Sequence, residues 1–358
     1  AHHTRFHHAI GCMHLMNKAI NQIKNKGHEI TEAEAEALKI AILLHDIGHG
    51  PFSHALEHSI TSNISHEHLS LLFMQRLNEQ FDGKLSLAIE IFQNKHPKQF
   101  LHQLVSSQLD MDRLDYLKRD SFFTGVTEGN IGTERIINML DVVADKLVVE
   151  EKGIYSIEKF LIARRLMYWQ VYLHKTVVSA ENMLIKVLQR AKELLKDGKE
   201  VYTNPYLGKF LKNNYTINDF EKNTILLNDF AELDDFDIYC SLKNWKNNPD
   251  FVLSSLSKMI LNRKLLKIKV QNTAFTAIEI LTEIDSVKQY YNITKKEAEY
   301  FIFSDKISNS TYNIEKANIN ILMKNGDVID ITSASGQFNI EALKKTISKY
   351  FLCYPKLK

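Results

Sequence analysis

The chain has 358 residues, of which 44% are hydrophobic and 25% are charged, and its formal net charge is +2 at pH 7. This composition is typical of a globular protein, and so small a charge argues against nucleic acid as the main partner. No run of roughly 18 uninterrupted apolar residues occurs, so we expect no membrane span. The three cysteines are far apart and odd in number, which argues against a disulfide framework and favours a cytoplasmic location.

The first half of the chain shows mostly helical spacing. With 13 glycines and 5 prolines it has few helix breakers. Thr31-Glu32-Ala33-Glu34 has the pattern of a capping box and opens a helix that ends at His45-Asp46. An alternating stretch at 147–157, centred on Lys152-Gly153, predicts a short β-hairpin. Apolar spacing predicts helices at about 4–26, 31–46, 65–80, 85–94, 99–107 and 133–145.

The second half begins with the longest helical pattern, at 157–195. Residues from about 200 to 290 are polar and rich in Asn and Lys between helical segments. Asn325-Gly326 between two apolar runs predicts a hairpin, followed by a helix at 340–350 and a strand at 351–354. We therefore expect a mainly α protein with a small mixed α/β lobe at its C-terminus. The expected divisions are 1–130, 131–290 and 291–358.

The histidines are concentrated at the start of the chain, where fourteen of the fifteen fall within the first 102 residues. The apolar run from Ala41 to Leu44 ends abruptly in His45-Asp46. Adjacent imidazole and carboxylate groups at the end of a buried helix are costly unless something satisfies them. A divalent metal ion is the usual partner for such a pair. The sequence therefore predicts a metal site at this helix end.

His8 and Asp112 are candidate partners of this pair. A histidine on the inner face of a helix is also commonly a hydrogen-bonded core residue. Asp112 lies in an aspartate-rich helical stretch, which also fits a charged face with i,i+4 ion pairs such as Asp115 with Arg119. Taken together, His8, His45-Asp46 and Asp112 would give one divalent ion three or four ligands and leave positions open for water and substrate.

Four segments carry a resemblance to a known family. They are T-R-F-H-H-A-I-G at 4–11, H-D-I-G-H-G-P-F-S-H at 45–54, His66-Glu67, and D-M-D-R-L-D-Y-L-K-R-D at 110–120. They resemble the HD-domain phosphohydrolases, and more narrowly their deoxynucleoside triphosphate triphosphohydrolase branch. The resemblance covers the first 130 residues closely and continues weakly through 164–175. It implies a helical HD core and metal-dependent hydrolysis of a dNTP to a deoxynucleoside and inorganic triphosphate.

The resemblance also implies a role for individual residues. The expected metal ligands are His8, His45, Asp46 and Asp112. The expected catalytic and α-phosphate residues are His49, His54 and His66, with His54 as general acid and Glu57 as its acidic partner. The expected substrate contacts are Arg5, Arg113 and Arg164 at the triphosphate, Tyr116 and Asp120 at the sugar, and Tyr172 where a ribose 2′-hydroxyl would lie.

The residues themselves support part of this assignment. Arg164, Tyr168 and Tyr172 recur at i, i+4 and i+8, so they fall near one stripe of a regular helix. An arginine and two aromatic rings along that stripe suit an anionic tail and a packed sugar and base. The alternative is that both tyrosines are core residues. Lys175 continues near the same face and is a further candidate for a phosphate contact.

The expected cofactor is one divalent ion, with Mn, Fe, Co, Ni, Zn and Mg all compatible with a His/Asp set. A second Mg²⁺ bound with the triphosphate is also compatible with the resemblance. Relatives in this family assemble from several copies and many respond to a nucleotide at a subunit interface. We therefore expect a homo-oligomer, a dimer or a tetramer, with a dNTP substrate and a nucleotide activator. The resemblance further implies several dozen residues before Thr4-Arg5-Phe6, including a polar group that contacts the sugar.

Two other functions are compatible with the residues. One is an HD-type 5′-nucleotidase or another phosphomonoester or cyclic-nucleotide hydrolase, for which three arginines at the phosphates would be superfluous. The other is a non-catalytic nucleotide sensor. The complete ligand set, together with His54 and His66, argues against a sensor.

Overall fold

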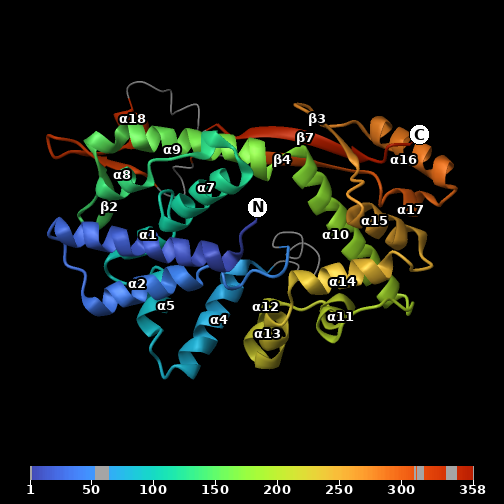
Figure 1. Cartoon of the computed structure of the whole chain (residues 1–358), viewed down its shortest axis with the longest axis horizontal. Helices are drawn as coiled ribbons and strands as arrows, with labels where there is room; N and C mark the ends of the chain where they lie inside the picture. Colours follow the sequence, from blue (N-terminus) through green and yellow to red (C-terminus); the bar gives the residue numbers. More distant parts are fainter. Residues whose placement is uncertain (1, 53–63, 310–311, 313–317, 336–344, 358) are drawn as a thin grey trace. The chain divides into compact units, whose positions relative to one another are not determined.

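The computed structural model describes residues 2–52, 64–309, 312, 318–335 and 345–357. Helices predominate, which confirms the predicted mainly α class (Figure 1). The chain forms two compact units, and their boundaries do not coincide with residues 130 and 290. Unit 1 comprises Ala1–Gly48, Phe73–Tyr172 and Asn309–Ile347, and unit 2 comprises His49–Leu72, Leu173–Ser308 and Ser348–Lys358.

Within the described part of the chain, we find no helix with the length and apolar character needed to cross a membrane.

Unit 1 contains helices and one small sheet. Its helices are α1 (Arg5–Asn25), α2 (Glu32–Leu44), α5 (Ser86–Phe92), α6 (Gln99–Val105), α7 (Met111–Thr124), α8 (Thr133–Asn138), α9 (Ile154–Met167) and α18 (Ile331–Ala334). Its strands are β1 (Leu140–Val143), β2 (Lys146–Glu150), β5 (Asn320–Leu322) and β6 (Val328–Asp330). Helix α4 (His66–Gln80) begins in unit 2 and ends in unit 1.

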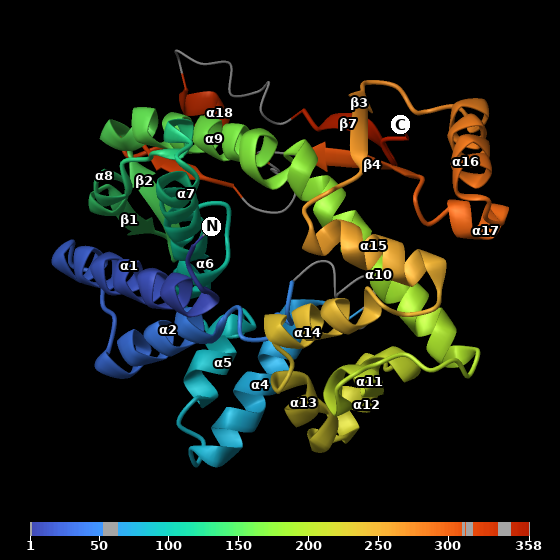
Figure 2. The same ribbon diagram turned by 45° about the vertical axis from the view of Figure 1, so that its right-hand side comes forward.

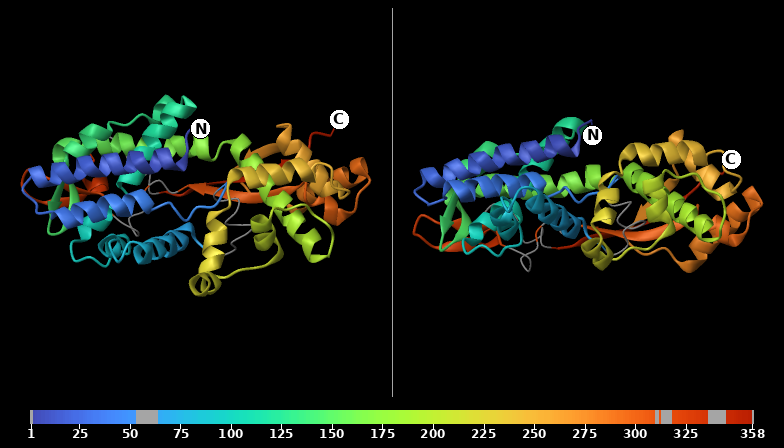
Figure 3. Two further views of the ribbon diagram at one scale, coloured as in Figure 1. Left: turned by 60° about the horizontal axis from the view of Figure 1, so that its bottom comes forward. Right: turned by 90° about the horizontal axis from the view of Figure 1, so that it is seen from below.

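Helices α1 and α2 lie side by side in every view (Figures 1 and 3). Each starts with a capping box. In α2 the Thr31 amide donates to Glu34 Oε2 at 2.8 Å, and the Glu34 amide donates to Thr31 Oγ1 at 3.2 Å, as the sequence predicts. Both helices pack apolar faces, including the fully buried Met16 and Leu38, into one core that α7 and α9 complete. Because that core is continuous, the ends of α1, α2 and α7 are held together.

The unit 1 sheet corrects two sequence predictions and confirms a third. The order is β1-β2-β5-β6, with β2 and β5 parallel. The helix predicted at 133–145 ends at Asn138, and the hairpin predicted around Lys152-Gly153 instead turns at Ala144 and Asp145. Both turn residues have positive φ, 47° and 61°, as a two-residue hairpin turn requires. The hairpin predicted at Asn325-Gly326 is confirmed by the antiparallel β5–β6 pair.

The helix predicted at 157–195 is also interrupted. After α9 the chain forms a π-helical turn, η3 (Tyr168–Tyr172), and a new helix, α10 (Lys175–Lys196), starts behind the N-cap His174. The break contains no glycine or proline. The apolar periodicity also continues across it, so the sequence does not indicate that the helix ends there. The boundary between the two units falls at the same place, after Tyr172.

Unit 2 is also mainly helical. Its remaining helices are α11 (Pro205–Lys212), α12 (Ile217–Lys222), α13 (Thr224–Ala231), α14 (Asp235–Trp245), α15 (Phe251–Leu261), α16 (Ala277–Tyr291) and α17 (Lys295–Ala298). Its sheet has the order β3-β7-β4, formed by β3 (Lys267–Gln271), β7 (Ile347–Tyr354) and β4 (Phe303–Asn309) (Figure 2).

Strand β7 corrects the predicted helix at 340–350. Residues Ile347 to Tyr350 are extended, and Tyr350 pairs with Gln271 of β3. A partner strand about 80 residues away supplies the backbone hydrogen bonds, and such tertiary pairing overrides local propensity. Residues 336–344 lie outside the described part of the chain. The C-terminal residues therefore contribute strands to both sheets, with β5 and β6 in unit 1 and β7 mostly in unit 2.

Candidate metal centre and active site

Helix α1 presents His8 to the interior of unit 1. The helix begins behind the N-cap Thr4, whose side chain accepts a hydrogen bond from the His7 amide, while His7 Nδ1 accepts from the Thr4 amide at 3.3 Å. His7 thus takes part in an exposed capping box, whereas His8 is 8% exposed. Of the two neighbouring histidines, His8 is the one that faces the buried site.

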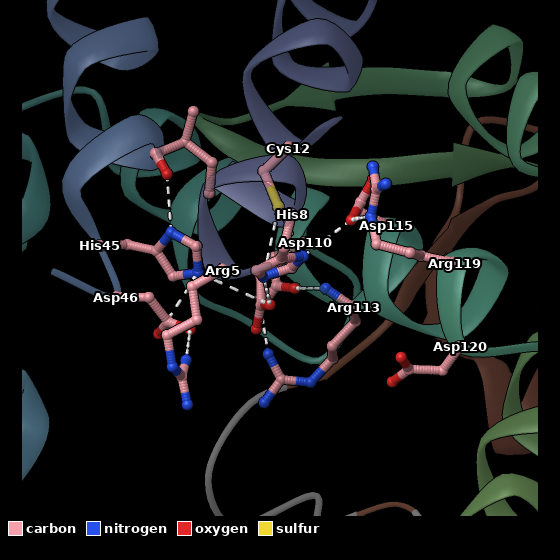
Figure 4. Close-up of polar contacts among 12 residues, drawn as sticks. Arg5, His8, Cys12, His45, Asp46, Asp110, Arg113, Asp115, Arg119 and Asp120 are labelled. Atoms are coloured by element: carbon pink, nitrogen blue, oxygen red, sulfur yellow. Dashed lines mark hydrogen bonds and ion pairs between the residues drawn. The ribbon is translucent and has the colours of Figure 1, made fainter. Parts of the chain in front are cut away.

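His45 follows α2 and is held through its backbone-facing nitrogen. Its Nδ1 donates a hydrogen bond to the Ile42 carbonyl at 2.6 Å, which leaves the Nε2 lone pair directed at the site (Figure 4). Nε2 is buried with no hydrogen-bond partner among the described residues. It lies 3.5 Å from Asp46 Oδ1 and 3.6 Å from Asp112 Oδ1. An orphaned buried nitrogen beside two carboxylates is the arrangement that a metal ion satisfies.

Asp112 completes the cluster from the first turn of α7. Its Oδ1 lies 3.1 Å from His8 Nε2. Although burial opposes its charge, His45 and His8 hold the pKa of Asp112 well below its usual range. Burial also disfavours the charged form of His8, but Asp112 and Asp115 outweigh it and raise the pKa of His8 to about 12. Asp112 thus keeps its negative charge beside the two histidines, in a place that favours a cation.

The spacing of these atoms fits a divalent metal. Bonds of about 2.0–2.2 Å to nitrogen and oxygen ligands put neighbouring ligand atoms roughly 3–3.6 Å apart. Asp112 lies 3.1 Å from His8 and 3.6 Å from His45, and Asp46 joins the set through its 3.5 Å contact with His45. We call these four residues the metal cluster. Imidazole and carboxylate ligands accept Mn, Fe, Co, Ni, Zn or Mg, so the ligand types do not select one metal.

Cys12 lies one helical turn beyond His8 and also borders the cluster. Its Sγ, with ligand atoms of His8, His45 and Asp112, forms a group in which all atoms lie within 4.8 Å of one another. However, Sγ is almost equidistant from the two His8 ring nitrogens, at 3.5 and 3.6 Å. It therefore sits over the ring and not in line with Nε2. Burial raises the pKa of the thiol to about 12, so Cys12 packs against the cluster as a neutral group.

The three arginines expected at the triphosphate have different surroundings. Arg5 Nη1 donates to Asp46 Oδ2 at 2.9 Å and its side chain is 45% exposed. Arg113 forms an ion pair with Asp110, the fully buried N-cap of α7 (Figure 4). Arg164 is 7% exposed and donates through Nη1 to the Gln108 amide oxygen at 2.9 Å. Among the described residues, no carboxylate forms an ion pair with Arg164, and its Nε has no hydrogen-bond partner.

The residues expected at the sugar surround Asp120. Its two carboxylate oxygens accept from the Tyr172 hydroxyl at 2.7 Å and contact His3 Nε2 at 2.9 Å. The Tyr172 ring makes edge contacts with the rings of Tyr116 and Tyr168, with centroids 6.0 and 5.3 Å apart. Burial and the nearby Asp120 raise the pKa of Tyr172, so its hydroxyl stays a donor. The three tyrosines expected to contact substrate thus form one group in unit 1.

Comparisons with known proteins show the family of this chain. A family model described as the HD domain matches residues 5–120, and one described as the HD associated region matches 131–203. The crystal structure of a phosphohydrolase from Bacteroides thetaiotaomicron is 52% identical, with a TM-score of 0.96, and the alignment covers 99% of this chain and 88% of that one. The chain belongs to the HD-domain phosphohydrolases.

Other relatives of this HD-domain phosphohydrolase are less similar. A Mycoplasma pneumoniae protein, the uncharacterized MG461 homolog, is 33% identical over 84% of this chain and 73% of its own length. A Dictyostelium discoideum protein named deoxynucleoside triphosphate triphosphohydrolase SAMHD1 homolog is 33% identical over 55% of this chain and 42% of its own length. Similarity to a protein of that name is thus confined to about half of each chain.

Four further expected residues of the HD-domain phosphohydrolase are His49, His54, Glu57 and His66. His54 and Glu57 fall outside the described residues. His49 and His66 belong to unit 2, where their rings stack at 3.8 Å with an interplanar angle of 13°. The metal cluster, the arginines and the tyrosines all belong to unit 1.

Sequence reasoning gave no site role to several residues that the structure brings to the site. His3 contacts Asp120, and Gln108 holds Arg164. Neither carries a local signal, because each contact joins segments more than 50 residues apart. The i,i+4 pair of Asp115 with Arg119 is confirmed, with a bidentate contact at 2.8 Å. The sequence did not indicate that Asp115 also reaches His8.

Proposed function

We propose that this chain hydrolyses deoxynucleoside triphosphates at the α-phosphorus and releases a deoxynucleoside and intact triphosphate. The observation that carries the proposal is Arg164, a buried guanidinium whose partner is the neutral Gln108. A buried charge without an opposite charge is costly, and an anionic ligand would offset that cost. A guanidinium presents a planar fork of donors that matches phosphate oxygens.

A second cation borders the same place. Arg113 and Arg164 both act electrostatically on the partly buried Tyr116, so both guanidiniums lie within electrostatic range of its hydroxyl. Arg113 is fixed by Asp110, through both its guanidinium and its backbone amide. An arginine held in this way can receive an anion with little loss of side-chain freedom. Two buried or half-buried guanidiniums suit a polyphosphate better than a single phosphate monoester.

The sugar end of the proposed substrate site is built from Asp120 and Tyr172. The Tyr172 hydroxyl and His3 hold the two oxygens of Asp120 in place, and its remaining lone pairs can accept a hydroxyl proton from a sugar. The Tyr172 ring packs against Tyr116 and Tyr168. A fixed ring at this place would leave little room for a 2′-hydroxyl, which supports a deoxyribose as the preferred sugar.

The proposed chemistry follows from these groups. His8, His45, Asp46 and Asp112 would hold a divalent ion, which would supply Lewis-acid polarisation of a phosphate oxygen and an activated water. Arg164 and Arg113 bind the triphosphate and compensate the negative charge that develops on it. Asp120 and Tyr172 orient the sugar, so that the α-phosphate is the group presented at the metal cluster.

The Dictyostelium relative named as a deoxynucleoside triphosphate triphosphohydrolase supports this substrate class. The family resemblance of the motif at 45–54 adds a further expectation, in which His54 would act as general acid for the leaving 5′-oxygen with Glu57 as its partner. A histidine suits this task, since its ordinary pKa lies near neutral pH.

The test is a matrix of metals and nucleotides. Metal-stripped protein is reloaded separately with Mn²⁺, Fe²⁺, Co²⁺, Ni²⁺, Zn²⁺ or Mg²⁺, and each dNTP is supplied alone and in pairs. We expect free triphosphate and deoxynucleoside in equal amounts. Release of orthophosphate, or turnover of nucleoside monophosphates instead, would show a phosphomonoesterase. Activity that appears only with a second nucleotide would support the proposed nucleotide activator.

A further inference from the structure

The side of His8 that faces away from the metal cluster makes a defined contact. His8 Nδ1 donates to Asp115 Oδ2 at 2.7 Å, and both side chains are at most 10% exposed (Figure 4). Because a carboxylate only accepts, Nδ1 must carry a proton, which leaves Nε2, 3.1 Å from Asp112 Oδ1, as the ring nitrogen that can bind a metal ion. The tautomer that can bind a metal is thus selected by Asp115.

Asp115 is itself held in one orientation. Arg119, one helical turn further along α7, donates through Nε to Asp115 Oδ2 and through Nη2 to Oδ1, both at 2.8 Å. This fork fixes the plane of the carboxylate as well as its position. An i,i+4 ion pair on an exposed helix face would contribute little, but this pair is partly buried and its carboxylate reaches a second helix.

Helix α1 makes room for this contact at Gly11. A Cβ at position 11 would lie 2.0 Å from Asp115 Oδ1 and 2.2 Å from Arg119 Nη2, which is closer than atoms can approach. Gly11 is three residues after His8, on the neighbouring part of the same helix. A side chain at position 11 would therefore push Asp115 and Arg119 away from His8.

We propose that Asp115 and Arg119 are positioning residues that fix the ring and the tautomer of His8 for the metal ion, with Gly11 providing the space. The proposal deepens the proposed function and rests on its metal dependence. His45 is held in the same sense by the Ile42 carbonyl, so both histidines are anchored at Nδ1. A hydrogen bond from Nδ1 to a carboxylate also raises the basicity of the ligand nitrogen, Nε2. The neutral carbonyl that anchors His45 has a smaller effect of this kind.

The experiment measures metal binding without nucleotide. Metal-stripped wild type, Asp115→Asn and Gly11→Ala are titrated with Mn²⁺ and with Co²⁺ by calorimetry, and the visible spectrum of the Co²⁺ form is recorded. We expect an affinity loss of about 10- to 100-fold in both variants, with an altered Co²⁺ spectrum. Thermal unfolding of the metal-free forms reports stability separately.

Two further variants keep the test decisive. Arg119→Lys retains the charge but cannot form the fork, so we expect a smaller affinity loss in a folded protein. Glu134→Gln removes the ion pair of Lys18 with Glu134, which joins α1 to α8 away from His8, and should leave affinity and spectrum unchanged. Wild-type affinity in Asp115→Asn overturns the proposal, as does equal loss in Glu134→Gln. Metal binding without dNTP turnover would count against the proposed function alone.

Discussion

The metal cluster and the arginine end of unit 1 have opposite electrostatics. The metal cluster places Asp46 and Asp112 around two buried histidines, with His45 Nε2 lacking a hydrogen bond among the described residues. The arginine end, which we define as Arg113 and Arg164, includes a buried guanidinium whose hydrogen-bond partner among the described residues is the neutral Gln108. Asp112 thus offers a negative charge at the metal cluster, and Arg164 a positive charge with no carboxylate partner among the described residues. A divalent ion and the proposed polyphosphate would complement these two charges.

The two regions also differ in how their side chains are held. In the metal cluster, both histidines are anchored through Nδ1, to Asp115 and to the Ile42 carbonyl. At the arginine end, the anchors are Asp110 and Gln108, which precede or open α7. Helix α7 therefore supports both regions. Substitutions that affect one region and spare the other can separate metal binding from nucleotide binding.

The largest expected effect comes from Asp112→Asn. It removes the charge that His8 and His45 share, and we expect metal affinity to fall by more than the roughly 10- to 100-fold that loss of a supporting partner costs. Hydrolase activity should fall to background. Metal content after dialysis and triphosphate release measure the two effects. Asp141→Asn is the matched control, because Asp141 also contacts a histidine, His28, at 2.6 Å. Full metal content in Asp112→Asn would remove this residue from the cluster.

Arg164→Gln affects the other region. The guanidinium is lost while a polar side chain remains, and we expect kcat/KM for dNTPs to fall about 100-fold. Metal affinity should remain that of the wild type, since among the described residues no hydrogen bond or ion pair joins Arg164 to the metal cluster. Arg135→Gln is the control, because Arg135 donates to the Lys152 carbonyl on an exposed surface and forms no ion pair with the residues that the structure describes. If Arg164→Gln loses metal and activity together, the two regions are not independent.

The metal cluster shows what the sequence could predict. His45-Asp46 follows an apolar, capped helix, so local pattern indicated both the helix end and the cost of burying the pair. His8 and Asp112 needed the family motifs, because nothing local distinguishes a ligand histidine from a core histidine. Asp115 was predicted only as part of an ion pair. Its contact with His8 joins residues that are 107 positions apart in the sequence and lie on different helices. Such a contact depends on how the helices pack, which local sequence patterns do not predict.

The segment after α9 shows what the sequence could not predict. Arg164, Tyr168 and Tyr172 were expected on one stripe of a regular helix, yet the helix changes to a π-turn at Tyr168. The tyrosine rings still meet, but the contact arises from an irregular backbone. Such π-turns occur often at functional sites and leave no mark in apolar periodicity. The strand at Ile347–Tyr350 escaped prediction for a similar reason, because its partner β3 is distant in sequence.

Tyr172→Phe tests the sugar end with a smaller effect. The substitution keeps the ring but removes the hydroxyl that donates to Asp120 at 2.7 Å. A hydrogen bond to a charged group contributes about 1.5–3 kcal/mol, so we expect kcat/KM for dNTPs to fall about 10-fold. Discrimination against ribonucleotides should persist, because the ring remains. Tyr168→Phe removes a hydroxyl without a hydrogen bond to the described residues and is the control. Equal kinetics in the two variants would argue that Asp120 does not contact the sugar.

The smallest effect is expected at the start of α2, the helix that leads to His45. Thr31→Ala removes the Thr31 half of the capping box with Glu34, and an N-cap of this kind contributes about 1 kcal/mol. We expect the free energy of unfolding, measured with urea on the metal-free protein, to fall by that amount, whereas Thr31→Ser should retain most of it. Metal affinity should not change in either folded variant, because the His45 ring is anchored locally, to the carbonyl of Ile42 in the last turn of the helix. A parallel loss of metal affinity in Thr31→Ala would mean that metal binding depends on the stability of the whole helix. The metal cluster and the arginine end would then differ in their dependence on helix stability as well as in their charge.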